Sequence, residues 1–102
     1  MDIYTALAEP NRRRIIELIA KKGSLTATDI SDEFDVTAPA ISQHLKVLRE
    51  SQLVQMGKVA QRRIYRINAD KLSEIEEWIQ KLKKVWNERF DRLDKILTKH
   101  SS

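Results

Sequence analysis

The fold is decided by residues 37–50, which read TAPAISQHLKVLRE. A threonine followed two positions later by proline is typical of a helix start. The hydroxyl caps free backbone N–H groups, and proline lacks an N–H that the first turn does not need. At 100° per residue, Ile41, Leu45 and Leu48 share one side and a polar strip lies opposite them. The stretch therefore predicts an amphipathic helix with one buried face.

A shorter helix is expected just before it. Thr26, with Asp29 three positions later, predicts a capping box at its start. This helix should run to about Phe34, which leaves only a tight turn before the next helix begins. Two helices joined so closely are typical of a helix-turn-helix, here residues 26–50.

After Gln52 the helical spacing gives way to alternation. Residues 53–56 and 62–67 predict paired strands around a loop at 57–61. A hairpin directly after a helix-turn-helix is the layout of a winged helix, so residues 53–67 are the predicted wing.

Two further helices are expected ahead of the motif, one ending near Glu9 and one from Pro10 to the stop signal at Gly23. The arginines at 12–14 open the second of these and are interpreted as a solvated face. The predicted fold class is mainly α with a small β-hairpin, in the order α-α-α-α-β-β-α. The 102 residues form a single winged helix-turn-helix domain in this interpretation.

The last predicted helix covers residues 69–98 and is about 45 Å long, more than so small a domain can cover. Its apolar residues recur every three or four positions with one stutter: Leu72, Ile75, Ile79, Leu82, Trp86, Phe90, Leu93 and Leu97. An identical copy is the simplest partner for such a seam. The alternative, a helix lying on a membrane surface, is disfavoured by its balanced charges. The predicted interface of a homodimer formed by the terminal helices consists of Ile3, Leu7, Ile79, Leu82, Trp86, Phe90 and Leu93.

The net charge of +4 is concentrated in the middle of the chain. Residues 1–36 carry −2, residues 37–68 carry +5, and residues 69–102 carry +1. A polyanion such as double-stranded DNA is one partner for this region, because Lys and Arg release its condensed counterions. A solvated basic surface without a partner is the alternative.

The polar strip of the 37–50 helix carries serine, glutamine and lysine, which hydrogen-bond base edges in a major groove. Arginines near a hairpin tip can enter a minor groove or bind phosphates. The candidate DNA-binding residues are Thr37, Ala38, Pro39, Ser42, Gln43, Lys46, Lys58, Arg62 and Arg63. The alternatives are an ordinary solvated helix face and a hairpin whose charges protect its edge strand. His44 lies beside the buried arc and is interpreted mainly as a packing and hydrogen-bonding residue, with a phosphate contact as the alternative.

Composition excludes several classes of function. The chain has no cysteine and only two glycines, so thiol catalysis, thiolate metal sites and glycine-rich phosphate loops are ruled out. With no catalytic constellation, we expect neither an enzyme nor a bound cofactor. Asp91, Asp94 and His100 offer one imidazole and two carboxylates, and we assign no metal site to them. No apolar run is long enough for a membrane span or a leader, which predicts a cytoplasmic protein.

The sequence resembles the ArsR (ArsR/SmtB) family of winged-helix repressors. The matching stretches are residues 6–16, 41–50, 53–54 and 62–67, and the block SQHLK at 42–46 is the most specific part. The resemblance implies a dimer made by the first and last helices and repression by occupying operator DNA. It also implies DNA contacts by residues at Ala38, Pro39, Ser42 and Gln43, with wing contacts near Arg62 and Arg63.

Two departures from the family pattern matter. Ser51-Gln52 stand where many relatives have a small residue and glycine, so Gln52 is expected in a left-handed conformation. The cysteine pair of the metal-sensing relatives is absent, so the resemblance is to family members without a recognisable metal site. The resemblance does not specify an effector. The predicted function is a sequence-specific repressor that binds a palindromic operator as a homodimer. The alternative is a winged-helix module that docks an acidic protein partner.

Overall fold

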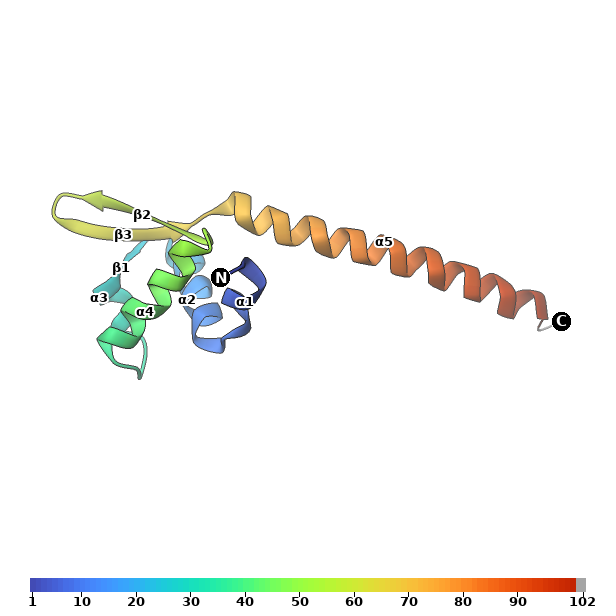
Figure 1. The fold of residues 1–102 in the computed structure, drawn as a ribbon, viewed down its shortest axis with the longest axis horizontal. Helices are drawn as coiled ribbons and strands as arrows, with labels where there is room; N and C mark the ends of the chain where they lie inside the picture. Colours follow the sequence, from blue (N-terminus) through green and yellow to red (C-terminus); the bar gives the residue numbers. More distant parts are fainter. Residues whose placement is uncertain (101–102) are drawn as a thin grey trace. The chain divides into compact units, whose positions relative to one another are not determined.

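The computed structural model describes the backbone of residues 1–100, and their side chains except those of Asp94 and residues 96–100. One unit extends to Lys71, and a second begins at Leu72 and contains most of the last helix. The elements in chain order (Figure 1) are α1 (Ile3–Ala8), α2 (Pro10–Lys22), β1 (Leu25–Thr26), α3 (Ala27–Ser31), α4 (Ala38–Glu50), β2 (Val54–Val59), β3 (Arg62–Ile67) and α5 (Ala69–His100). This is the predicted winged helix-turn-helix order, with one additional short strand.

Side-chain caps define where the first two helices begin, and a glycine defines where the second one ends. Asp2 accepts a hydrogen bond from the Thr5 N–H at 2.7 Å at the start of α1. Glu9 does the same for the Arg12 N–H at 2.8 Å at the start of α2, where proline occupies the first turn. Gly23 ends α2 with φ of 93°, the left-handed region that glycine enters at low cost.

The helix-turn-helix consists of α3 and α4. The predicted capping box is confirmed, since Thr26 and Asp29 exchange hydrogen bonds of 3.1 Å. The expectation that this helix reaches Phe34 is wrong, because α3 ends at Ser31. After that residue the backbone changes to tighter bonds three residues apart, with the Phe34 N–H donating to the Ser31 carbonyl.

The wing lies where it is predicted, but its first strand extends further along the chain than the sequence pattern predicts. β2 continues to Val59 and pairs antiparallel with β3, so the expected loop at 57–61 shrinks to a turn at Ala60 and Gln61. Gly57 and Lys58, which have low strand propensity, are held in the strand by ladder pairs with residues of β3.

A third strand was not predicted. β1 pairs antiparallel with β3, which gives a three-stranded sheet in the order β1-β3-β2. Two residues are too few to display a two-residue period, so nothing in the sequence announces this strand.

The core joins the helices of the first unit to the inner face of the sheet. α2 packs against α4 and β3, and its Ile15 and Ile19 side chains have almost no exposure. The largest fully buried side chains are Ile15, Ile19, Ile30, Ile41, Leu45, Leu48, Leu53 and Val54. The predicted buried face of α4 is therefore confirmed, and it fixes which face of α4 is exposed.

The end of α4 confirms the left-handed conformation expected at Gln52, whose φ is 66°. The Gln52 N–H donates to the Arg49 carbonyl and the Leu53 N–H to the Leu48 carbonyl, both at 3.0 Å. These two bonds make a Schellman motif that turns the chain into the wing. The Asn68 side-chain amide donates to the Gln52 carbonyl at 2.9 Å, which ties the two ends of the wing together.

Candidate nucleic-acid interface

The exposed face of α4 carries the residues that the sequence predicts to contact bases. Ser42, Gln43 and Lys46 are exposed, as are Ala38 and Pro39 at the start of the helix. Their opposite face is fully buried, so the helix cannot rotate to hide them. A rigid helix with short polar side chains near its N-terminal end has the dimensions and chemistry that a major groove accepts.

The start of α4 is held by its cap. Thr37 accepts a hydrogen bond from the Ala40 N–H at 3.3 Å, and its side chain remains exposed. Thr37 takes the Ala40 N–H and Pro39 has none, so the first turn keeps at most the Ala38 N–H for a ligand, beside the positive end of the helix dipole. This arrangement favours a phosphate close to the beginning of α4.

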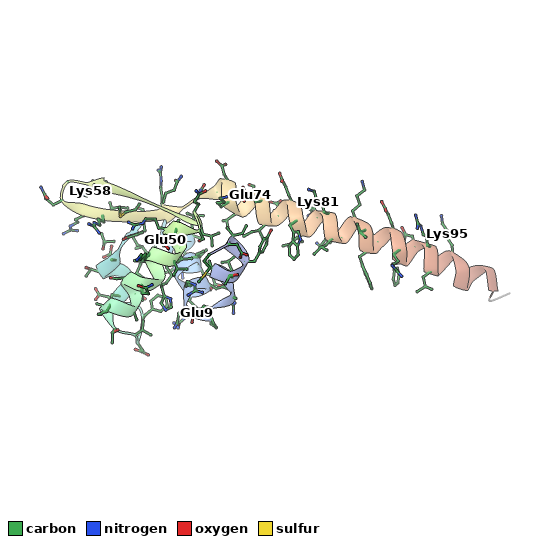
Figure 2. The ribbon with its side chains drawn as sticks, viewed as in Figure 1. Glu9, Glu50, Lys58, Glu74, Lys81 and Lys95 are labelled. Atoms are coloured by element: carbon green, nitrogen blue, oxygen red, sulfur yellow. The ribbon has the colours of Figure 1, made fainter. Side chains whose placement is uncertain are left out.

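The wing places the predicted cations near its tip. Lys58 lies directly opposite Arg63 in the strand pair, and Val59 lies opposite Arg62. All three basic residues are exposed, and Figure 2 labels Lys58 beside the turn. Like charges directly opposite each other destabilise a strand pair. A bound polyanion would neutralise Lys58 and Arg63 together and remove that cost.

Arg62 and Arg63 also line a cavity of about 400 Å³ at the start of α3. Asp29, on its rim, has a pKa below its ordinary value, because the backbone and side chain of Thr26 hydrogen-bond to it and Arg62 adds a positive charge nearby. Arg62 is therefore partly balanced by a carboxylate of the protein. Among the predicted wing residues, Lys58 and Arg63 are the better candidates for phosphate contacts.

Two further cations were not singled out from the sequence. Arg49 from the last turn of α4 and Arg66 from β3 line a groove of about 610 Å³ together with Lys58. Arg49 is held there by donating to Met56 Sδ at 3.4 Å. The only sequence signal for this grouping was the charge of +5 over residues 37–68.

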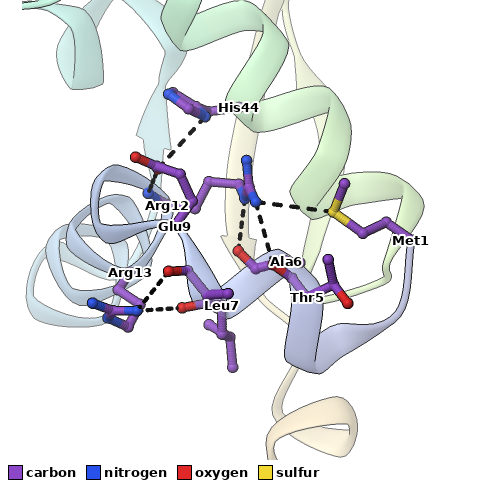
Figure 3. A network of polar contacts seen from close by, with 9 residues as sticks. Met1, Thr5, Ala6, Leu7, Glu9, Arg12, Arg13 and His44 are labelled. Carbon is purple, nitrogen blue, oxygen red and sulfur yellow. Dashed lines mark hydrogen bonds and ion pairs between the residues drawn. The ribbon is translucent and has the colours of Figure 1, made fainter.

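The interpretation of the arginines at 12–14 as a solvated face is confirmed for the exposed Arg13 and Arg14, whereas Arg12 is partly buried, and Arg12 and Arg13 also hold α1. Arg12 Nε donates to the Ala6 carbonyl at 2.6 Å, and Arg13 Nη1 donates to the Leu7 carbonyl at 2.6 Å (Figure 3). These carbonyls belong to the last turn of α1, where no further helical N–H is available to them. The third, Arg14, stacks over the Phe34 ring at 4.6 Å.

His44 connects α4 to the same polar network. Its Nδ1 lies 3.9 Å from Glu9 Oε2, with the two side chains 18% and 32% exposed (Figure 3). Burial opposes ionisation of Glu9. Hydrogen bonds from the Arg12 and Asn11 backbone, with the charges of His44 and Arg12, outweigh it and lower the pKa of Glu9. This contact agrees with the prediction that His44 is a packing residue.

The predicted dimer residues fall into two groups. Ile3 is 8% exposed and Leu7 is half-buried, so within the chain these two α1 residues already have apolar neighbours. The α5 residues are 40–65% exposed, which is far more than large apolar side chains of a core show: Ile79, Leu82, Trp86, Phe90 and Leu93.

The described residues contain no group of three or more side chains that could hold a metal ion. Of the three residues Asp91, Asp94 and His100, the side chains of Asp94 and His100 lie outside the described part of the chain. Within that part, no helix combines the length and apolarity that a membrane span requires.

Comparison with known proteins assigns the chain to a family. The family model for bacterial regulatory proteins of the arsR family matches residues 9–56. The transcriptional repressor SdpR of Bacillus subtilis (strain 168) is 31% identical over 78 residues, which cover 76% of this chain and 86% of that protein. The arsenical resistance operon repressor of Staphylococcus xylosus is 31% identical over 75 residues, covering 74% and 71%.

Solved structures give the same result. A possible transcriptional regulator for arsenical resistance superposes with a TM-score of 0.72 at 33% identity, over 91% of this chain and 93% of that one. An ArsR-like transcriptional regulator from Rhodococcus sp. RHA1 shares the fold, with a TM-score of 0.81 at 22% identity over 92% and 88%. The chain belongs to the ArsR family of winged helix-turn-helix proteins, and it is a DNA-binding transcriptional regulator rather than an enzyme.

Proposed function

We propose that this regulator is a repressor that binds a palindromic operator in double-stranded DNA as a homodimer in the cytoplasm. The observation that carries the proposal is the exposed strip of Ser42, Gln43 and Lys46 on a helix whose other face is fully buried. Base-reading groups are thus presented on a surface that has no role in the core. SdpR and the Staphylococcus xylosus protein are named repressors, which supports the direction of regulation.

In this proposal each part of the interface has one task. Ser42 and Gln43 read base edges, and Lys46 reaches a guanine or a phosphate. The start of α4 attracts a phosphate through the helix dipole and the Ala38 N–H. Lys58 and Arg63 of the wing bind the neighbouring backbone or minor groove. Thr37, Ala38, Pro39 and Arg62 complete the contact surface.

Two copies read twice as many base pairs as one, which raises the specificity ratio over the many competing non-specific sites. We assign the dimer interface to the exposed apolar residues of α5 together with Leu7 of α1, while Ile3 supports α1 from the core. A two-fold dimer places its two α4 helices in successive major grooves, about 34 Å apart on one face of the duplex.

The test is selection of bound sequences from a random pool of duplex DNA with the full-length protein. We expect an inverted repeat whose half-site centres are about 10 base pairs apart. If each subunit neutralises about four phosphates, log K should fall against log salt with a slope near −7. Equal binding of every sequence and of unrelated polyanions would instead support a module that docks an acidic partner.

A further inference from the structure

One edge of the sheet is open. The strand order is β1-β3-β2, so β2 is an outer strand, and within the part of the chain that the structure describes it pairs only with β3 (Figure 1). An edge strand presents a row of backbone N–H and C=O groups that can pair with another extended segment. Gln55, Gly57 and Lys58 are exposed along this strand, which leaves the edge accessible.

The hydrogen-bond pattern of the hairpin shows which backbone groups of β2 point to the open edge. The Asn68 N–H donates to the Leu53 carbonyl at 3.0 Å, so residues 53 and 68 form a hydrogen-bonded pair. Along an antiparallel ladder such pairs alternate with pairs that are not bonded to each other. Met56 and Lys58 fall in the pairs of the second kind, so their N–H and C=O groups point away from β3.

A groove of about 610 Å³ lies along this edge. Residues 55–59 of β2 form most of its lining, together with Arg49, Ile64 and Arg66. Lys58, Arg49 and Arg66 bring three positive charges to it from three different elements, and none of the residues that line it is acidic. The groove therefore favours an anionic occupant.

The outer face of the groove is apolar and has an open place at Gly57. Apart from its chain neighbours, no heavy atom lies within 4 Å of the position that a Cβ of Gly57 would take. Gly57 does not have a positive φ, so the backbone does not require glycine there. A glycine inside a strand often marks a site where another backbone approaches closely. Ile64, directly opposite Gly57, is half-buried, and Val59 is 63% exposed.

The two faces of the strand pair favour different side chains in an added strand. Successive side chains of a strand point to opposite faces. Lys58 lies on the same face as Met56, whose Sδ accepts a hydrogen bond from Arg49, whereas Gly57 and Ile64 lie on the other face. A segment that alternates acidic and apolar residues places its carboxylates on the cationic face and its apolar side chains on the other.

Two other occupants fit the groove less well. A second copy of this chain would bring Lys58 and Arg49 beside the same cations of its own β2 edge, and like charges oppose that pairing. A DNA backbone could neutralise the cations, but it offers neither backbone N–H groups for the open edge nor an aliphatic side chain for the place at Gly57.

We propose that an extended segment of a partner protein, with alternating acidic and apolar side chains, adds to the open edge of β2 as a further strand. Its backbone pairs with Met56 and Lys58, and its carboxylates face Lys58 and Arg49. Its apolar side chains lie over Gly57 against Ile64. This interaction goes beyond the proposed function and does not depend on it. Because Lys58 belongs to both surfaces, the bound segment removes one cation from the DNA-binding surface.

NMR titration of the full-length protein tests the proposal. The probe is a synthetic, terminally blocked peptide of six residues that alternate glutamate and valine. We expect saturable shifts of the backbone amide resonances that are largest for residues 55–59. The same peptide with methylated backbone nitrogens cannot donate to the β2 carbonyls and should bind at least about tenfold more weakly. A peptide that alternates lysine and valine should not bind.

Arg49→Ala tests the charge of the groove. It should weaken binding of the glutamate–valine peptide by about two- to fivefold, whereas Arg92→Ala, at an exposed arginine of α5, should not change it. Equal binding of the methylated peptide would overturn the strand addition, and so would the absence of shifts at millimolar peptide.

Two further outcomes would assign the cations to DNA instead. Shifts confined to residues 42–46 and 62–63 would show that the peptide binds only the DNA-binding surface. If Arg49→Ala lowers the affinity for duplex DNA and leaves that for the peptide unchanged, the groove is part of the DNA contact. Each of these results overturns the inference and leaves the operator proposal standing, because the operator is tested separately by selection from a DNA pool.

Discussion

Gln52 holds a backbone conformation that suits glycine. Its φ of 66° lies in the left-handed region, where a Cβ comes too close to the neighbouring carbonyl oxygen. The Schellman motif and the bond from Asn68 use only the backbone of Gln52, and its side chain is exposed. Nothing in the described contacts requires the glutamine side chain at this position.

We therefore predict that Gln52→Gly raises the free energy of unfolding by about 0.5–1 kcal/mol. Urea denaturation monitored by tryptophan fluorescence or circular dichroism measures the change. The matched control is Gln55→Gly in β2, where glycine relieves no strain and should lower stability by a similar amount. A destabilised Gln52→Gly protein would contradict the argument.

Gln43 is the residue on which base recognition depends most directly. Its side chain is exposed on α4, and bidentate pairing of glutamine with adenine contributes about 1–3 kcal/mol of discrimination. Gln43→Ala should lower operator affinity by that amount and relax the preference at one base pair of each half-site. Binding to a panel of single-base operator variants measures this. Gln80→Ala on α5, the same change at another exposed position, should leave every affinity unchanged.

At the scale of elements, carboxylates cap the first three helices. Asp2, Glu9 and Asp29 accept backbone N–H bonds at the starts of α1, α2 and α3. Their folded-state pKa values lie below the ordinary 3.8 of Asp and 4.5 of Glu. A group whose pKa falls on folding stabilises the protein above its unfolded pKa and loses that contribution as the pH falls through its folded pKa.

Stability should consequently be constant from pH 7 to about 5 and fall as the pH drops below the ordinary Asp and Glu values near 4. Urea midpoints between pH 3 and 6 measure the effect. The urea midpoint of Asp29→Asn should fall less steeply with decreasing pH than that of the parent, because one of the three capping carboxylates has been removed. Asp35→Asn, an exposed carboxylate outside the caps, is the control and should follow the parent curve.

The wing contributes charge rather than sequence reading. Arg63 lies opposite Lys58, so its contacts with phosphate add to those of its neighbour. Arg63→Ala should weaken binding to all DNA sequences by a similar factor and reduce the salt slope by about one for each subunit. Titrations at several salt concentrations with operator and random duplex separate this from a loss of specificity. An effect confined to the operator would assign a base contact to Arg63 instead.

How far the sequence predicts these elements depends on how local their causes are. The caps at Thr26 and Thr37, the buried face of α4 and the strained Gln52 follow from residues within one or two turns, and all were predicted. β1 exists only because β3 passes beside it. The role of Arg12 likewise depends on the carbonyls that α1 presents to α2. Such contacts are tertiary, and a single sequence that is read without an alignment gives no signal for them.

For the molecule as a whole, the polar network around Glu9 links α1, α2 and α4, and so joins a helix of the proposed dimer interface to the proposed recognition helix. Arg12 and Arg13 hold the end of α1, Glu9 caps α2, and His44 brings α4 to the same carboxylate (Figure 3). If α1 contributes to the dimer interface, the network fixes the position of α4 relative to that interface through polar contacts. Operator spacing then depends on the dimer as well as on the recognition helix.

The dependence of operator binding on the dimer is tested by Trp86→Ala. Trp86 and Val85 are both 65% exposed in the chain, but only Trp86 lies at the centre of the apolar strip of α5. This strip consists of the exposed α5 residues of the proposed dimer interface: Ile79, Leu82, Trp86, Phe90 and Leu93. Trp86→Ala should shift sedimentation equilibrium towards monomer and lower operator affinity by a factor of about 100 or more, because the second half-site no longer binds as part of one molecule. Affinity for a single half-site should be unchanged, since α4 and the wing are untouched.

The matched control is Val85→Ala, on the flank of the strip, which should change the sedimentation and the operator affinity far less. A Trp86→Ala protein that remains dimeric at micromolar concentration would show that the apolar strip of α5 is not the dimer interface. Operator affinity would then not depend on this strip.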